Sequence, residues 1–277
     1  MTATTNSRQG EKGFTLVELS IVMIIIGLLI GGILKGQELI ANARLASTVS
    51  KIKAIDAAMN TFRDSYAALP GDVVDPDTRL PNCIAATKCG GADGNGNNQI
   101  GAINSTGSAV AAGSENIRAW AQLAATDLLG GIRNAPDAAN IESGATVPSA
   151  EVPGQIFIGY ENGITRPTNA AGTGSVPRGG HYLLIHNGMA TPGATATQAT
   201  VTTATAAGTG SLTPGQASRI DTKLDDGAPN VGSVIAMGGV PSGTPAVGGC
   251  VSAVADTATY ATAVTGTTCG VYVRVQQ

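Results

Sequence analysis

The chain has 277 residues, four cysteines and a formal net charge of −3, and only 13% of its residues are charged. A charge balance this close to neutral argues against a polyanion-binding domain, so no clear nucleic-acid site is expected. The length is enough for one membrane segment followed by one substantial globular core.

An apolar run from Phe14 to Leu34 follows a polar leader, residues 1–13, whose net charge is +1. The run is about as long as a helix needs to cross the hydrocarbon core of a bilayer. A secretory signal peptide would have a shorter apolar run followed by a small-residue cleavage site. We therefore expect residues 14–34 to be retained as a single-pass transmembrane helix, with the leader on the cytoplasmic side.

The run contains one carboxylate, Glu18, which is costly in a bilayer unless a partner pairs with it. Gly13, Phe14 and the TLVE step to Glu18 resemble the class III signal of type IV pilins and type II secretion pseudopilins. The resemblance implies cleavage between Gly13 and Phe14 by a prepilin peptidase, followed by methylation of the new Phe14 amine. It also implies that Glu18 faces the Phe14 amine of a neighbouring subunit, so that docking into a filament becomes favourable. The alternative is a simple membrane anchor that tolerates its glutamate.

An amphipathic continuation of this helix is predicted over residues 35–68, because apolar residues recur at three- and four-residue steps as far as Tyr66. Pro70 and Gly71 should end it. Glycines four residues apart place small groups on common helix faces, which permits close approach of neighbouring helices. These are Gly27, Gly31, Gly32 and Gly36. Their alternative role is local flexibility of the helix.

From residue 69 the composition changes to Gly, Ala, Thr, Ser and Asn, which predicts a globular β-rich head with loop insertions over residues 69–277. Four short runs bounded by Gly or Pro predict one antiparallel sheet. They are residues 155–160, 181–186, 232–237 and 270–275. Residues 114–132 predict a helix capped by Ser114, with Trp120 as a core anchor. Residues 190–215 lack large apolar groups, which predicts an exposed loop, either O-glycosylated or irregular β. The fold class is therefore α+β, and the resemblance implies the pilin fold, a long N-terminal helix packed on this head.

The cysteines form two local pairs in the head, Cys83 with Cys89 and Cys250 with Cys269. An even number in an oxidising periplasm predicts two disulfides, of which the second ties a long loop to the last strand. That second loop resembles the disulfide-bounded region near the C-terminus of many type IV pilins. Zinc is the weaker alternative, because the spacing forms no CxxC knuckle and the two histidines, five apart on one predicted strand, point to opposite faces.

The stretch DGNGNNQIG, residues 93–101, alternates oxygen-bearing side chains like half of a calcium loop. The candidate calcium ligands are Asp93, Asn95, Asn97 and Gln99. The closing bidentate glutamate is missing, so Glu115 would have to reach the loop from the next helix. One firm carboxylate predicts weak affinity of the extracellular type, and the alternative is a plain Asn/Gly turn.

Asp225 and Asp226 of the LDDG sequence predict either a second cation site or the caps of a turn. Four pieces of the head together resemble a large minor-pilin-like family: ALPGD at 68–72, the 93–101 loop, the predicted helix that begins at Ser114, and residues 221–234. The sequence contains no GxSxG elbow, no HExxH and no phosphate-binding loop, and its two histidines offer little acid–base capacity. We therefore expect a protein that is not an enzyme and requires no cofactor. A membrane-tethered extracellular binding module or hydrolase is the second hypothesis.

With the resemblance, the sequence predicts a structural subunit of a type IV pilus-like filament, with a type II secretion pseudopilin as the alternative. The expected partners are the prepilin peptidase, identical or related subunits, and an inner-membrane assembly platform. The precursor is expected in the inner membrane with its head in the periplasm. The mature chain is then expected in a pilus at the cell surface or in a periplasmic pseudopilus, serving adhesion, motility, DNA uptake or secretion.

Overall fold

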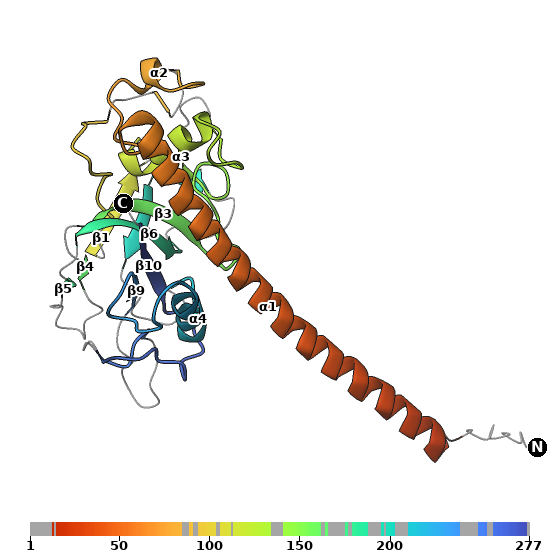
Figure 1. The fold of residues 1–277 in the computed structure, drawn as a ribbon. Helices are drawn as coiled ribbons and strands as arrows, with labels where there is room; N and C mark the ends of the chain where they lie inside the picture. The colour runs from red at the N-terminus through yellow and green to blue at the C-terminus, as the bar shows by residue number, and fades with distance from the viewer. Residues whose placement is uncertain are drawn as a thin grey trace, which may run out of the picture. The chain divides into compact units, whose positions relative to one another are not determined.

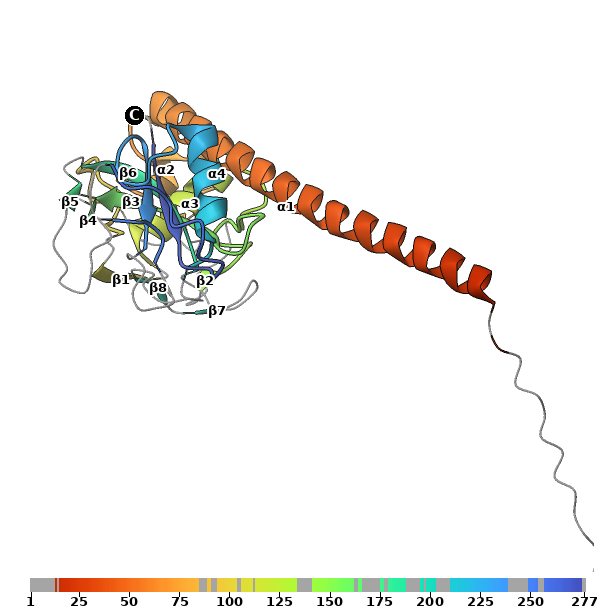
Figure 2. The ribbon, with the colours of Figure 1, turned by 90° about the horizontal axis from the view of Figure 1, so that it is seen from below.

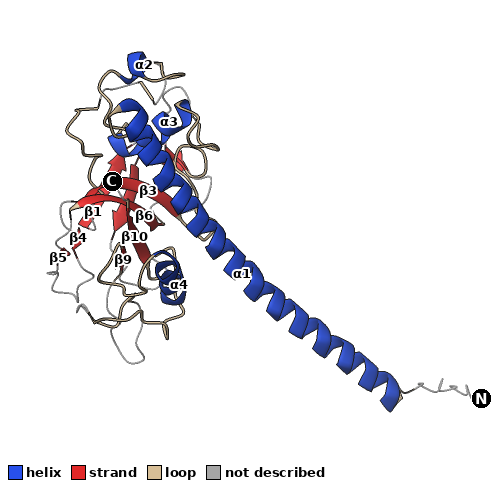
Figure 3. Ribbon diagram, in the orientation of Figure 1, coloured by secondary structure: helices blue, strands red, loops and turns tan. Residues whose placement is uncertain are grey.

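A computed structural model describes most of the chain, in segments separated by gaps. The described residues are 13, 15–84, 89–90, 94–103, 106–111, 113–133, 141–161, 164–165, 175–176, 179–187, 195–196, 198–202, 210–238, 249–253 and 257–275. The chain divides into two compact units, Met1–Ala43 and Arg44–Gln277. Helix α1 (Leu16–Tyr66) contributes residues to both units (Figures 1 and 3).

Helix α1 ends close to the position that the sequence predicts. Ala67 adopts a left-handed conformation with φ of 51°, and its N–H group bonds the Arg63 carbonyl at 2.8 Å. Pro70 and Gly71 follow, and Gly71 has φ of 92°. A Cβ at Gly71 would lie 2.3 Å from the Glu115 carbonyl oxygen, so only glycine fits this close approach to the start of the next long helix.

A four-stranded antiparallel sheet in the order β3-β6-β10-β9 forms the centre of the second unit (Figure 1). Its strands are β3 (Gln155–Glu161), β6 (Gly180–His186), β10 (Gly270–Arg274) and β9 (Val234–Met237). All four predicted strands and their antiparallel pairing are thus confirmed. Ile158 lies opposite Leu183, which in turn lies opposite Val273, so one row of apolar side chains crosses three strands.

Both faces of this sheet are buried. Ile52 of α1 lines the same depression as Leu183 and Val273, so the part of α1 within the second unit covers that face. A side chain at Gly159 would face the opposite side of the sheet from Ile158, because successive residues of a strand face opposite sides. Its missing Cβ would lie 2.6 Å from Asn116 Nδ2 of helix α3 (Glu115–Ala125), which covers the second face.

The prediction of a helix over residues 114–132 is right at its start and wrong at its end. Ser114 occupies the N-cap position, although its side chain makes no capping hydrogen bond to the helix, and Trp120 is completely buried, as expected. The helix stops at Ala125, because Asp127 adopts a left-handed φ of 56° and the N–H groups of the next two residues both bond the Leu123 carbonyl. A left-handed residue therefore ends the helix before the predicted end at residue 132.

Helix α4 (Pro214–Leu224) falls mostly outside the sequence predictions. Thr213 and Gln216 form a capping box, in which each side chain bonds the other residue's backbone N–H group at 3.0–3.2 Å. Pro214 occupies the first helical position, where its fixed φ favours the helix. The T-x-x-Q spacing was the available sequence signal for this helix.

The predicted exposed loop at 190–215 is wrong at its C-terminal end, where Gly210, Ser211 and Leu212 are buried. The reason is backbone pairing, since Leu212 bridges Cys269 next to β10. The same range contains two short strands, in keeping with the irregular β alternative. These are β7 (Thr195–Ala196), which pairs with β2 (Ile141–Glu142), and β8 (Gln198–Thr202), which pairs with β1 (Thr106–Ala111). All four strands are labelled in Figure 2. The remaining described elements are α2 (Pro76–Arg79) and the pair β4 (Ile164–Thr165) and β5 (Ser175–Val176).

Candidate assembly site

The first turn of α1 is closed by a reciprocal pair of side chains, Thr15 and Glu18. The Thr15 N–H and hydroxyl groups both donate to Glu18 Oε2 at 2.9 Å, and the Glu18 N–H donates to Thr15 Oγ1 at 3.2 Å. This is a capping box, which satisfies backbone donors that a helix start otherwise leaves unpaired. Glu18 was predicted from the sequence, but the capping role of Thr15 was not, although the T-x-x-E spacing indicates it.

Glu18 therefore has a partner within its own chain. Both Thr15 donors use Oε2, and within the described residues Oε1 accepts no hydrogen bond. A second donor from outside the subunit can bond the carboxylate without breaking the cap. Phe14, the predicted source of that donor, lies outside the described residues, and Gly13 next to it is exposed.

The apolar side chains of α1 in the first unit have no interior to pack into. From Leu16 to Leu34 the large ones are between 44% and 86% exposed. By length and composition α1 could cross a membrane, with a mean hydropathy of 2.6 in its most apolar window. A continuous apolar surface of this kind requires lipid or other protein to cover it.

The four predicted packing glycines lie on this exposed helix. A Cβ added at Gly27, Gly31, Gly32 or Gly36 would meet no atom within 4 Å. Contacts within the described chain therefore give no reason for glycine at these positions. A role in packing against other helices stays a prediction.

The head is cross-linked by both cysteine pairs. Cys83 is joined to Cys89, and Cys250 to Cys269, and all four residues are buried. These bonds use every thiol of the chain, so no cysteine is available as a zinc ligand. His181 and His186 lie on opposite faces of β6 and are buried, and His181 Nε2 accepts the Ile100 N–H at 3.2 Å.

The glycine-rich loop of residues 94–101 wraps around carboxylates that come from elsewhere in the chain. Asp72 is 2% exposed, and its two oxygens accept the N–H groups of Gly96 and Asn98 at 2.7 Å. The loop also contacts Glu115, whose carboxylate accepts hydrogen bonds from the backbone N–H groups of Asn95 and Gly101. Burial and the nearby Asp72 charge raise the pKa of Glu115. The structure thus brings Glu115 to the loop, and it adds Asp72 as an anchor that was not predicted from the sequence.

The candidate calcium ligands take part in local turns. Asn95 Oδ1 accepts the Asn97 N–H at 3.0 Å, and Asn97 Oδ1 accepts the Gln99 N–H at 2.8 Å. These are Asx turns, which need no metal. Asp93 lies outside the described residues. Calcium binding therefore stays a prediction.

We expect 10 mM calcium to raise the melting temperature of the full chain by a few degrees over 10 mM magnesium. A site with a Kd of about 10⁻⁴ to 10⁻³ M would gain about 1.4 to 2.7 kcal/mol under these conditions. Thermal unfolding in detergent measures the difference, and Asn97→Ala should reduce it. Equal melting temperatures in the two salts would leave the loop as a plain Asn/Gly turn.

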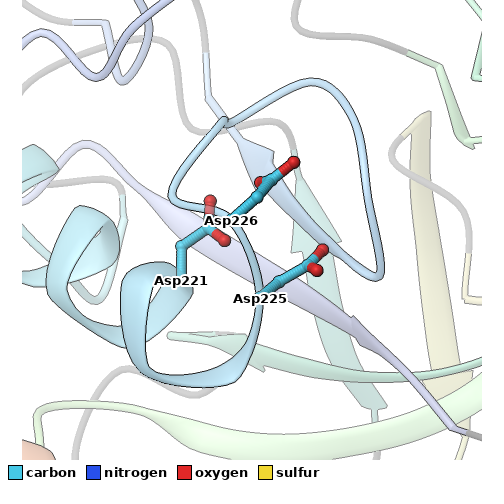
Figure 4. Close-up of side chains that lie close together, drawn as sticks. All are labelled: Asp221, Asp225 and Asp226. Carbon is cyan, nitrogen blue, oxygen red and sulfur yellow. The ribbon is translucent and has the colours of Figure 1, made fainter.

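A second acidic group surrounds the end of α4 (Figure 4). Asp221, Asp225 and Asp226 place carboxylate oxygens within 4.8 Å of one another. Asp225 accepts the N–H groups of Ser233 and Val234, and Asp226 accepts the Ala228 N–H at 2.8 Å. Asp226 therefore caps the turn after α4, which is one of the two predicted roles, and Asp225 joins this turn to the start of β9.

Comparison with known proteins finds one family model that matches this chain. Residues 8–34 match the family model described as the prokaryotic N-terminal methylation motif, as expected of a type IV pilin or pseudopilin precursor. The chain matches no curated protein and no solved structure at a level that indicates a relative. The matched range includes the Thr15–Glu18 cap and most of the exposed apolar helix. The chain therefore carries the N-terminal methylation signal of a pilin-type precursor.

Proposed function

We propose that the mature chain is a structural subunit of a type IV pilus-like filament, whose core is a bundle of N-terminal helices. The observation that carries the proposal is the part of α1 that lies in the first unit. It is an exposed apolar helix with a capped carboxylate in its first turn. The match to the methylation motif over residues 8–34, which includes these residues, also supports it. The proposal assigns no catalysis to the head.

Glu18 would act at the step in which a subunit leaves the membrane. In the precursor, Thr15 supplies donors to one carboxylate oxygen and lowers the cost of holding Glu18 in lipid. Cleavage after Gly13 would create the Phe14 amine, and the amine of a neighbouring subunit would pair with the other oxygen. Opposite charges in a low dielectric attract strongly, so this pair would fix the axial register of adjacent helices.

The spacing of residues along α1 supports bundling beyond the membrane segment. Uncharged residues recur at alternating steps of four and three, the pattern of helices that pack side by side. In the first unit they are Val22, Ile26, Leu29 and Ile33, and in the second unit Ser47, Ser50, Ala54, Ala57 and Thr61, all exposed. The small side chains in the second unit would permit close approach of neighbouring helices.

A type II secretion pseudopilin would use the same helix and the same charge pair, and differs in where the filament forms. A membrane-tethered binding module or hydrolase would leave α1 as an anchor only. Mechanical shearing of cells, followed by immunoblotting of the sheared and membrane fractions, tests for surface filaments, and immunogold electron microscopy of permeabilised cells tests for periplasmic ones. The proposal predicts the chain in sheared surface filaments. Filaments confined to the periplasm would indicate a pseudopilus, and a chain found only in membranes would contradict assembly.

A further inference from the structure

The end of α4 is joined to the C-terminal loop by one buried hydrogen bond. Asp221 is fully buried in the last turn of α4, and its Oδ2 accepts the Tyr260 hydroxyl at 2.8 Å. Tyr260 is 6% exposed and belongs to the loop closed by the Cys250–Cys269 disulfide. The other Asp221 oxygen accepts the Gly227 N–H at 3.1 Å. This contact connects a helix to a loop 39 residues away in sequence.

The charges around Asp221 are unfavourable to its ionised form. Asp225 and Asp226 lie within 4.8 Å, and the donors that reach Asp221 itself are neutral (Figure 4). Strand β9, which α4 contacts, carries no ionisable side chain. In the described part of the disulfide loop, Tyr260 is the only titratable side chain. The cations of α4, Arg219 and Lys223, lie two positions from Asp221, and residues two apart on a helix do not face each other.

Burial, with the charges of Asp226 and Asp225, raises the pKa of Asp221 to about 6, although the bonds from Tyr260 and Gly227 act in the opposite direction. Burial beside Asp221 also raises the pKa of Tyr260, so this hydroxyl remains a neutral donor at all physiological pH values. Between neutral and mildly acidic pH, the proton occupancy of Asp221 is therefore what changes in this contact.

We propose that Asp221 and Tyr260 form an acid-strengthened clasp, which holds the loop closed by Cys250–Cys269 more firmly against α4 as the surrounding pH falls from neutral to about 5. A proton from solvent binds the Asp221 carboxylate and removes its repulsion with Asp225 and Asp226. The neutral carboxyl group still accepts the Tyr260 hydroxyl, so the link to the loop is kept. The clasp depends on the head alone and is independent of filament assembly.

The direction follows from proton linkage. The native carboxyl titrates near pH 6, whereas an exposed aspartate titrates near its ordinary value of 3.8, so the closed state binds more protons between these values. Closing is then favoured as pH falls through 6, and the gain is complete below 3.8. Between pH 7.5 and pH 5 these two values predict about a tenfold increase in the ratio of closed to open loop.

Hydrogen exchange of the full-length chain in detergent tests the clasp. Peptides covering residues 257–269 are compared at pH 7.5 and pH 5, as protection factors corrected for the intrinsic exchange rate. The wild type should gain about tenfold protection at pH 5. Asp221→Asn should show the same high protection at both pH values, because its amide is neutral and still accepts the Tyr260 hydroxyl. Tyr260→Phe should show lower protection than the wild type at each pH, since the link is gone, and should still gain protection at pH 5, because the burial that raises the pKa of Asp221 remains.

Asp77→Asn, which alters an exposed acid of α2, is the matched control and should respond to pH like the wild type. Asp226→Asn keeps the test decisive if Asp221→Asn does not fold. It removes a charge that raises the pKa of Asp221, so the midpoint of the protection change should move to lower pH. Protection that is independent of pH in the wild type, or a tenfold rise retained in Asp221→Asn, would overturn the clasp. An unmoved midpoint in Asp226→Asn would do the same.

Discussion

Replacing Glu18 by valine is expected to remove the chain from sheared filaments while leaving it in the membrane. The variant helix is more apolar, so anchoring improves, but a neighbour's Phe14 ammonium would then enter the filament core without a partner. Breaking one side of a buried ion pair costs about 3 to 5 kcal/mol, which corresponds to a loss of more than a hundredfold in docking. The ratio of chain in the sheared fraction to chain in the membrane fraction measures this.

Thr15→Val is the matched control for the Glu18 variant. It removes the cap of α1, at a cost of about 1 kcal/mol, but keeps the carboxylate that is proposed to meet the amine. Filament yield should therefore fall modestly in Thr15→Val and vanish in Glu18→Val. Normal filaments from Glu18→Val would show that the carboxylate serves no assembly role and would favour a simple anchor.

The melting temperature of the head is expected to fall as pH is raised from 5 to 8, and Glu161 should account for most of the fall. Glu161 lies at the end of β3 and is 4% exposed, and its Oε1 has no hydrogen-bond partner in the described chain. Burial raises its pKa from 4.5 to about 8. The native state therefore holds a proton that the unfolded state releases between these values, and stability is lost as pH rises through 8.

The size of this effect makes it measurable by thermal unfolding. The two pKa values give a loss of about 3 to 4 kcal/mol between pH 5 and pH 8, on the order of 10 °C for a head of this length. Glu161→Gln carries a neutral group of the same shape, so it should be more stable than the wild type at pH 8 and should lose most of the pH dependence, leaving the smaller contribution of Asp221. Glu151→Gln, at an exposed position, is the control. A wild-type slope retained in Glu161→Gln would assign the pH dependence to other groups.

The central sheet could be predicted because its strands are short apolar runs with clear Gly or Pro boundaries. Helix α4 was harder, since its apolar face consists of Ala217, Ile220 and Leu224 on a polar sequence. A periodicity that weak is easily missed, and only the Thr213–Gln216 box marks where the helix begins. The end of α3 was not predictable from composition, because a non-glycine residue, Asp127, takes the left-handed conformation.

The functional residues also fall into those that the sequence indicates and those that only the folded structure reveals. Glu18 could be found from sequence because a carboxylate interrupts an apolar run, and Thr15 shares its motif. Asp72 and Tyr260 could not, since they act through partners 24 and 39 residues away. Only the folded chain brings these groups together.

Mass spectrometry of the N-terminal peptide, from chain purified out of membranes and filaments, tests the central claim most directly. Removal of residues 1–13 from the 277-residue chain leaves 264 residues, with the net charge changed from −3 to −4 because the leader carries +1. The account predicts a mature N-terminus at N-methylated Phe14. An intact Met1, or a cut beyond Leu34, would contradict it, because the amine proposed to meet Glu18 would then never form.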